Sequence, residues 1–492
     1  MKYFKYILIL ALTSGMKPCL SQNSSSYGST DYRIEAFGSA TKGGYTPFWI
    51  AGNRYGTVPL DAGNGYLRAG TFHNRAAGKN IRWGAGLDVI ASSPRYRHVY
   101  IQQIYVEAGY KWLSMTIGSK ENYTSLWDKN LSSGDMVFSA NARPMPEINI
   151  YTPQFTAVPG TNGFLQFRGN FAVGRSFDTD YLKQLKNNLH YIENVLWHHK
   201  SLHIRLLDTH HNFPLTATLG VRHHAQWGGV STNPAEGVQP HSIKDFVRII
   251  MGRSGGDDAS LSAQVNVLGN HYGSYDLNFG YLSPLFDIHL YKQHFFDDMS
   301  GVELFNLPDG LYGVQVDISD FPLINKVVFE YLYTKNQSGP AHYIIYDHSA
   351  YPGYGGGSDE YYNNGEYTTG VSYFNRSLGS PLITSPEYNK DGRIGFKNNR
   401  IQAWHIGIDG YLSGQVAYRV LMTNAEGWGT PIRPFRKKTN DFTCAVKISY
   451  CHPRLEGWLF SGEIGADRGS LYGNNSGVAI SISKTGLIKA WK

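Results

Sequence analysis

The stretch Phe442-Thr-Cys-Ala-Val-Lys-Ile-Ser-Tyr450 alternates apolar and polar side chains with a period of two. One face carries Phe442, Cys444, Val446, Ile448 and Tyr450, and the other carries Thr443, Lys447 and Ser449. The same alternation appears in residues 412–422, 458–467 and 478–483. Segments of about ten residues that alternate in this way, separated by turn residues, are typical of the strands of a transmembrane β-barrel.

The N-terminus predicts export of the chain. Lys2 and Lys5 precede an apolar run over residues 6–12, and small residues precede a predicted cleavage site near Ser21. A membrane helix needs about 20 apolar residues, and this run is far shorter. Residues 1–21 are therefore predicted to be a secretory signal peptide that is removed, and the alternating strands predict the outer membrane as the destination.

The composition favours one large β protein. The 492 residues include 55 Gly and 35 Tyr, with 14% aromatic and 17% charged residues. The formal net charge is +7, and three of these positive charges lie in the predicted signal peptide, which leaves about +4 on the mature chain. This charge is too small to indicate nucleic acid as a partner.

Two cysteines, Cys444 and Cys451, remain after the predicted cleavage. An exported protein can form disulfides. Seven positions along one strand span roughly 23 Å, however, which is far more than a disulfide bridges. We therefore predict two free thiols.

The alternating segments predict the topology of an all-β chain. If the last strand, at about 477–488, ends in the periplasm, connections must alternate between short inner turns and long outer loops. Counting backwards gives about 18 antiparallel strands over residues 66–492, with Asp409-Gly410 as one inner turn. Residues 22–65 and 120–162 lack sustained alternation and are predicted to be periplasmic, with small helical or irregular plug segments.

The charges of these segments decide which face meets lipid. A Lys or Arg facing lipid at mid-membrane costs roughly 2 to 4 kcal/mol. The charged residues are therefore predicted to point into the barrel: Arg82, Asp88, Arg168, Asp317, Lys326, Glu330, Arg419, Lys447, Glu463 and Asp467. A secreted β-sandwich or propeller also alternates, but strand length, the Tyr and Trp content and the signal peptide together favour the barrel.

Interruptions of the alternation are the candidate functional segments. Residues 179–196 have helical spacing and belong by parity to an outer loop. The longest excursion, 335–400, is interpreted either as a flexible Gly-rich loop or as a carbohydrate platform in which Tyr rings stack on sugars and acids bond hydroxyls. The predicted polysaccharide-binding residues are Trp227, Asp298, Tyr361 and Tyr362.

Six motifs in order resemble a known family, over residues from about 30 to the end of the chain. They are Met136-Val-Phe-Ser-Ala-Asn-Ala-Arg-Pro-Met-Pro-Glu-Ile, Trp227-Gly-Gly, Gly269-Asn-His-Tyr-Gly-Ser-Tyr-Asp, Tyr291-Lys-Gln-His-Phe-Phe-Asp-Asp-Met-Ser-Gly, Pro308-Asp-Gly-Leu-Tyr-Gly and Glu330-Tyr-Leu-Tyr-Thr-Lys-Asn-Gln-Ser-Gly. This set resembles the capsule assembly protein Wzi family, in its Bacteroides-type branch. The resemblance implies an outer-membrane barrel of eighteen strands, helices that close the periplasmic side, loops that obstruct the lumen, and binding of capsular polysaccharide at the cell surface. It supplies no catalytic residues.

Two groups of residues suggest enzymatic or metal chemistry and are judged weak. Seven histidines lie within residues 198–224, but none has the His-Glu-x-x-His spacing of a zinc protease, and neighbours such as His223 and His224 face opposite sides of a strand. Asp297 and Asp298 near Glu303 resemble a glycosidase pair, yet carboxylates on an outer loop are more often solvated or bound to hydroxyls. We predict no catalytic residue, no metal and no cofactor.

Two functions of different classes follow. The preferred hypothesis is a non-enzymatic surface lectin that organises or retains the capsule, with capsular polysaccharide, outer-membrane lipid and other capsule export components as partners. The alternative is a porin or substrate-specific channel, because lumen charges such as Lys326 and Glu330 suit a solvated pore as well as a plug. An outer-membrane hydrolase is a distant third.

Overall fold

The computed structural model describes residues 28–94, 97–185, 189–208, 213–337 and 359–491. The predicted signal peptide, 1–21, lies outside the described residues, as do residues 338–358 of the long excursion.

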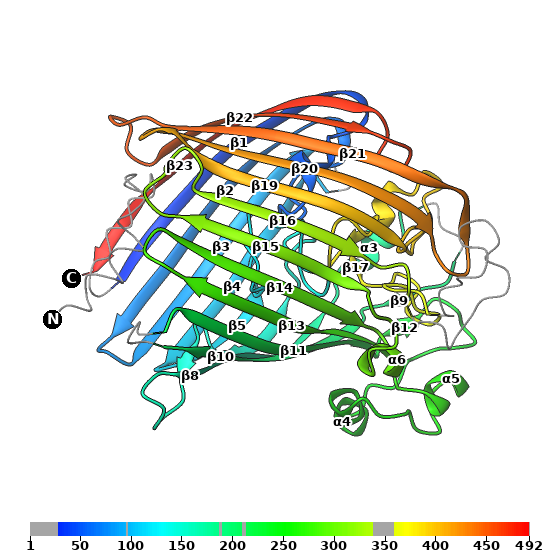
Figure 1. Cartoon of the computed structure of the whole chain (residues 1–492). Helices are drawn as coiled ribbons and strands as arrows, with labels where there is room; N and C mark the ends of the chain where they lie inside the picture. Colours follow the sequence, from blue (N-terminus) through cyan, green and yellow to red (C-terminus); the bar gives the residue numbers. More distant parts are fainter. Residues whose placement is uncertain (1–27, 95–96, 186–188, 209–212, 338–358, 492) are drawn as a thin grey trace.

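One antiparallel sheet closes on itself to form a barrel (Figure 1). The sheet has 19 strands, and because β6 and β7 both pair with the same side of β8, the wall has 18 positions. Pairing of β1 with β23 closes the wall, so the predicted fold is confirmed. The wall strands are β1 (Gly28–Tyr45), β2 (Asp61–Ala77), β3 (Ile81–Ser93), β4 (Val99–Tyr110), β5 (Leu113–Ser119), β6 (Glu147–Tyr151), β7 (Thr156–Ala157), β8 (Leu165–Arg175), β10 (Leu196–Leu207), β11 (Leu215–Trp227), β13 (Asn270–Leu282), β14 (Phe286–Phe296), β15 (Gly310–Ile318), β16 (Lys326–Tyr333), β19 (Ile401–Ser413), β20 (Val416–Gly429), β21 (Pro434–Cys451), β22 (Trp458–Arg468) and β23 (Asn475–Trp491).

The two ends of the barrel differ in the length of their connections. At the end that holds the start of β1 and the end of β23, the strands are joined by short turns, such as residues 78–80 and 414–415. All the long connections lie at the opposite end, including residues 228–269 and 334–400 (Figure 1). We call these the turn end and the loop end.

The barrel begins earlier than the predicted residue 66. β1 occupies Gly28–Tyr45 and pairs along most of its length with β2 and β23, so the prediction of a periplasmic segment over 22–65 is wrong. The alternation is weak because, beyond Ile34, the outward positions are small: Ala36, Gly38 and Ala40 are exposed. Residues 46–60, with the short helix α2 (Phe48–Ala51), connect β1 to β2 at the loop end.

The prediction of a periplasmic segment over 120–162 is also wrong. Residues 120–146 enter the lumen from the loop end, and β6 and β7 belong to the wall. The segment reaches down toward the turn end, because Asp128 accepts a hydrogen bond of 2.8 Å from Lys326 at the first position of β16. Buried loops of this kind do not alternate, since every side of the chain has a neighbour.

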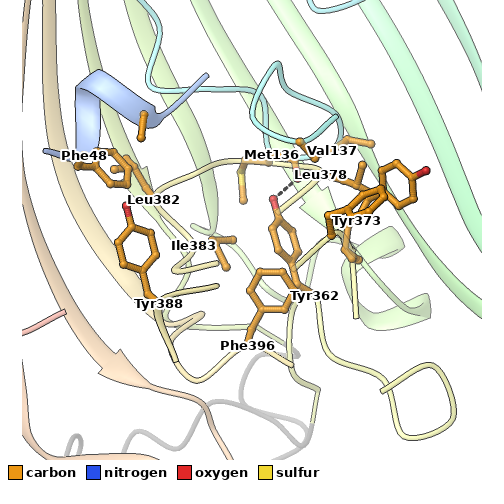
Figure 2. Packing of buried hydrophobic residues seen from close by; sticks show 14 of the residues in the cluster. Phe48, Met136, Val137, Tyr362, Tyr373, Leu378, Leu382, Ile383, Tyr388 and Phe396 are labelled. Carbon is orange, nitrogen blue, oxygen red and sulfur yellow. Dashed lines mark hydrogen bonds between the residues drawn. The ribbon is translucent and has the colours of Figure 1, made fainter. Parts of the chain in front are cut away.

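Three segments that enter from the loop end fill the lumen. Residues 46–60, 120–146 and 359–400 pack together with inward side chains of the wall into one hydrophobic core. Figure 2 shows Tyr362 of the third segment directing its hydroxyl to the Met136 carbonyl of the second, with Phe48 of the first beyond Leu382. The family resemblance implied helices closing the periplasmic side; here the filling is mostly irregular chain that enters from the other end.

Several of the charges predicted to point inward form ion pairs in the lumen. Asp88 is fully buried and binds both Arg33 and Arg68, and Glu463 binds Arg54 of the first lumen segment. The Asp88 pairs join neighbouring wall strands, whereas the Glu463 pair joins the wall to a lumen segment; either would leave a buried charge without compensation if one partner were lost.

Outside the wall, the secondary structure is short. The helices are α3 (Thr179–Leu182), α4 (Ile243–Met251), α5 (Leu261–Val265), α6 (Met299–Val302) and the 3₁₀ helix η2 (Pro386–Tyr388), and the small ladders pair β9 (Ile192–Glu193) with β12 (Val230–Ser231) and β17 (Ser372–Tyr373) with β18 (Arg376–Ser377). Of the helix predicted over 179–196, the residues that the structure describes form only a first turn, where Leu182 is buried, whereas Leu189 is exposed. In the described part of the chain, no helix is long and apolar enough to cross a membrane. Among the described residues, neither Cys444 nor Cys451 takes part in a disulfide, as predicted.

Candidate functional site

A cavity of about 1420 Å³ lies at the loop end of the barrel. Its walls come from the connection after β14, the start of β13, the α4–α5 region, the long excursion after β16 and the connection between β20 and β21. The lining is rich in carboxylates and amides, namely Asp297, Asp298, Asp359, Glu360, Glu366, Asn270, Asn363 and Asn364, with Arg393, Lys397 and Arg433 on the same surface. Such a surface offers both acceptors and donors to a polar ligand.

Three carboxylates meet in this cavity. Oxygens of Asp297, Asp298 and Asp359 lie within 4.8 Å of one another, and all three side chains are partly buried. Burial, followed by repulsion from Asp359 and then Asp298, raises the pKa of Asp297 well above its usual value. A protonated Asp297 can donate a hydrogen bond as well as accept one. Among the described residues, this is the one group whose ligand atoms lie close enough to hold a metal ion together.

The Asp298 carboxylate caps the helix α6 and also lines the cavity. Its Oδ1 atom accepts hydrogen bonds from the Gly301 amide at 3.1 Å and from the Ser300 hydroxyl at 2.7 Å, which caps the first turn of α6. The cap fixes the orientation of the carboxylate toward the cavity.

The amides are held in a similar way. The Asn364 Oδ1 atom accepts hydrogen bonds from the Glu366 and Tyr367 amides at 2.9 and 3.0 Å, while its Nδ2 atom donates to Asn270 at 3.3 Å. Asn363 donates to the Phe396 carbonyl at 2.8 Å. The polar lining is thus built on turns whose own backbone hydrogen bonds fix it, so a ligand meets it in a defined arrangement.

Two of the three cations of the cavity are paired with an acid. Lys397 lies 2.6 Å and Arg393 lies 3.6 Å from Asp391. The hydrogen bond from Lys397 is the main cause that holds the pKa of Asp391 below its usual value. All three side chains are about half exposed, so the pairs are screened by water and the cations remain available to an anionic sugar.

Two of the four predicted site residues are buried in the plug. Tyr361 and Tyr362 are 0% and 1% exposed. The Tyr361 hydroxyl accepts a hydrogen bond of 2.6 Å from Asn306, and the Tyr362 hydroxyl donates to the Met136 carbonyl (Figure 2). A ring that stacks on a sugar must be exposed, so the stacking role predicted for these two residues is wrong for this structure.

The other two predicted residues lie in different places. Trp227, at the end of β11, is 5% exposed and stacks on Phe246 of α4 with ring centroids 5.3 Å apart, so it too offers no open face. Asp298 alone lines the cavity. Of the four predicted residues, only the adjacent Tyr361 and Tyr362 therefore lie together.

Asp359 and Asn364 line the cavity and flank the two tyrosines in the same short motif of the predicted carbohydrate platform, although they were not among the four predicted binding residues. The sequence does contain a pattern that indicates these two residues, namely polar side chains next to aromatic ones. A loop that covers a core turns its aromatic rings inward and its acids and amides outward.

The histidines divide between the two faces of the wall, as expected for adjacent strand residues. His199 and His224 stack 4.9 Å apart in the lumen, whereas His223 donates to or accepts from His271 at 2.8 Å on the outer face. Glu303, predicted as a neighbour of the acidic pair, is absent from the acidic cluster, and Asp359 takes that place.

The comparisons with known proteins agree with this geometry. The family model described as capsule assembly protein Wzi matches residues 51–382, about two thirds of the chain. The chain belongs to the capsule assembly protein Wzi family. Its fold is accordingly that of an outer-membrane β-barrel, and assignment to the Bacteroides-type branch stays a prediction.

Several solved structures are similar to the chain at low identity. One is the Escherichia coli Wzi, titled an outer membrane protein involved in group 1 capsule assembly and a carbohydrate-binding β-barrel, with TM-score 0.58, 11% identity, and coverage of 92% of this chain and 84% of that chain. Pseudomonas aeruginosa OpdL (8% identity, 94% and 99% coverage) and OccK7 (9%, 94% and 100%) each give a TM-score of 0.47. No curated protein matches the chain.

Proposed function

We propose that this protein binds capsular polysaccharide in the loop-end cavity and thereby holds or organises the capsule at the cell surface. The observation that carries the proposal is a large cavity, lined by fixed carboxylates and amides, on a barrel of a capsule assembly family. Outer-membrane barrels have short periplasmic turns and long outer loops, which assigns the loop end to the outside, where the capsule lies.

The chemistry of the lining fits a polymer of sugars. Hydroxyl groups donate to carboxylates such as Asp298 and accept from amides, so one repeat unit satisfies several groups of the cavity at once. Each such contact exchanges a hydrogen bond to water for one to protein, and its net contribution is only about 1 kcal/mol. Retention of a long polymer therefore relies on many repeats that engage many barrels.

The filled lumen argues against the alternative porin function. Residues 120–146 cross the lumen, where Asp135 binds Arg222 at 2.6 Å and Met136 donates to Gln293 at 2.7 Å, both on the wall. A pore would require this packed segment and its partners to separate. We propose instead that the polymer stays outside, and that its synthesis and export belong to other capsule components.

The test is binding of the purified, detergent-solubilised protein to capsule from the same strain. Asp298→Asn keeps the cap of α6 but removes the negative charge, and Asn364→Ala removes an amide of the lining. Each is expected to weaken binding about tenfold, the equivalent of roughly 1.4 kcal/mol. Glu456→Gln, at an exposed position of the turn end, is the matched control.

Two outcomes would overturn the proposal. The first is a wild-type protein that binds the capsule no better than an unrelated barrel does. The second is a set of variants that all bind like the Glu456→Gln control. We also propose that the protein is not an enzyme, so the length of the polymer should be unchanged after prolonged incubation with it; shortening would favour a hydrolase.

A further inference from the structure

The connection between β11 and β13 folds back over the outer face of the barrel, where it carries α4 and α5 (Figure 1). Ala225 and Trp227, the last outward residues of β11, pack with Ile249 of α4 and Ala263 of α5 into a small core that is separate from the lumen core. Lys200 of β10 donates to the Ile250 carbonyl. The two helices are thus docked on the outside of the wall at the loop end.

The helix α4 is firmly defined. Ser242 and Asp245 form a capping box at its start, and Gly252 ends it in the left-handed conformation with φ of 60°. Its orientation on the wall is set by Phe246 and Ile249, which face Trp227 and the small core. The side chains on the rest of the helix therefore have fixed directions.

The residues that the structure describes leave most of the apolar side of α4 exposed. At about 100° per residue, Phe246, Ile250, Ile243, Val247 and Met251 fall in that order along one arc of the helix. Phe246 lies at the edge that faces the wall, whereas Ile243 and Val247 are 86% and 52% exposed. On α5, Leu261 and Val265 are 79% and 82% exposed.

The position of α4 along the barrel points to what covers this surface. Outward residues of β11 are exposed from Leu215 to Val221 and become covered at Ala225. From Leu215 to Ala225, a strand with a rise of roughly 3.3 Å per residue and a tilt of about 40° climbs about 25 Å. This is the height of the apolar band of such barrels, so α4 lies where the band ends.

Exposed cations lie beside the apolar arc, and two exposed carboxylates, Asp257 and Asp258, follow in the connection to α5. Lys244 follows Ile243 and is exposed, Arg253 is exposed just after the helix, and Arg248 pairs with Asp245 at 2.9 Å. An apolar stripe beside Lys and Arg is the pattern of a helix that lies in a membrane interface, where the cations meet anionic headgroups.

We propose that α4 and α5 form an anchor that lies in the interface of the outer leaflet around the barrel. Ile243 and Val247 extend the lipid-facing surface of β10 and β11 into the acyl chains, and Lys244 and Arg253 contact anionic headgroups. The anchor fixes the rotation and depth of the barrel beside the cavity, whose lining includes Met251 and Ala263 of the same helices.

The test measures the surroundings of single spin labels in vesicles of phosphatidylcholine and phosphatidylglycerol. In a background of Cys444→Ala and Cys451→Ala, labels are placed at Val247→Cys on the apolar arc and at Lys244→Cys on the polar side. Val221→Cys, on the exposed outward face of β11, supplies the reference for lipid. Folding of each variant is checked by its heat-dependent migration in gels.

The Val247 label is expected to collide several-fold more with oxygen than with a water-soluble nickel chelate, as the Val221 label does, whereas the Lys244 label favours the chelate. Equal preference of both helix labels for the chelate would overturn the proposal. Low collision with both reagents, together with spin–spin broadening that grows with protein density, would overturn it in favour of a second copy. The pair Leu261→Cys and Ser262→Cys repeats the test on α5 if an α4 variant does not fold.

Discussion

Glu330 shows how one inward charge joins the wall to the plug. It is buried in β16 and accepts hydrogen bonds of 2.6 Å from the Ser132 hydroxyl, the Ser133 amide and the Tyr291 hydroxyl. Glu330→Ala leaves three buried donors without an acceptor, and we expect unfolding in urea to show a loss of about 3 kcal/mol. Glu456→Ala should change stability by less than about 0.5 kcal/mol, and a similar value for both would contradict the assigned role of Glu330.

Asp309 predicts how stability depends on pH. It is fully buried just before β15, and burial raises the pKa of its carboxyl to about 8, although it accepts hydrogen bonds from the Asn336 and Gln337 amides. The folded state thus keeps a proton that the unfolded chain releases near its ordinary pKa of 3.8. Stability should therefore fall as pH rises from about 4 to about 8, by at most about 1.4 kcal/mol per pH unit from this group.

The control for this prediction is Asp309→Asn, which cannot titrate. Urea midpoints of this variant should be flatter between pH 4 and 8 than those of the unchanged protein. Parallel profiles would show that other groups govern the dependence.

For single residues, the sequence indicated the chemistry of a side chain better than its burial. Asp298, predicted to bind polysaccharide, lines the cavity, since a carboxylate on an outer loop is seldom buried; its binding role stays a prediction. Tyr361 and Tyr362 have equally good sugar-binding chemistry, but their burial depends on Met136 and Asn306, which lie far away in the sequence. No local pattern contains that information.

Among the elements, α4 provides a test of local stability. Ser242 caps its start, and Ser242→Ala should destabilise the helix by about 1 kcal/mol. Amide hydrogen exchange should become faster over Ile243–Met251, while the strands β10 and β11 keep their rates. Ser260→Ala, which removes the corresponding cap of α5, should accelerate exchange in α5 instead.

Strands with large outward side chains were easier to predict from the sequence than strands with small ones. β21 and β22 carry large apolar side chains outward and were recognised at once, whereas β1, with small outward residues, was missed. Asp409-Gly410 was wrongly predicted as a turn and lies within β19. Gly410 is needed there for close approach, since a Cβ atom would lie 2.2 Å from the Leu323 carbonyl oxygen.

The filled lumen of the whole molecule predicts a barrel that does not conduct ions. Because three segments pack across the lumen, wild-type protein in planar bilayers should show no stable large conductance. A variant in which residues 122–145 are replaced by a short Gly-Ser connection should open, because the segment that reaches Lys326 is then gone. Large stable openings of the wild type would instead favour the porin.

The alternation predicted about 18 strands and their direction, and the family resemblance implied the same number. The filling of the lumen from the loop end could not be predicted, because it rests on contacts between residues hundreds of positions apart, such as Trp49 with Thr423 at 3.0 Å. Buried irregular chain has neither a period of two nor a helical period, so the sequence offers no pattern from which to place it.

The seam between β1 and β23 also sets an order of biogenesis. Gly28 pairs with Trp491, so β1, the first wall strand in the chain, has its second neighbour only when β23, the last strand, is in place. Until then two strand edges stay open, and open edges invite pairing with other chains. Closure of the wall therefore needs both ends of the chain, and the two edges are protected only once β1 and β23 have paired.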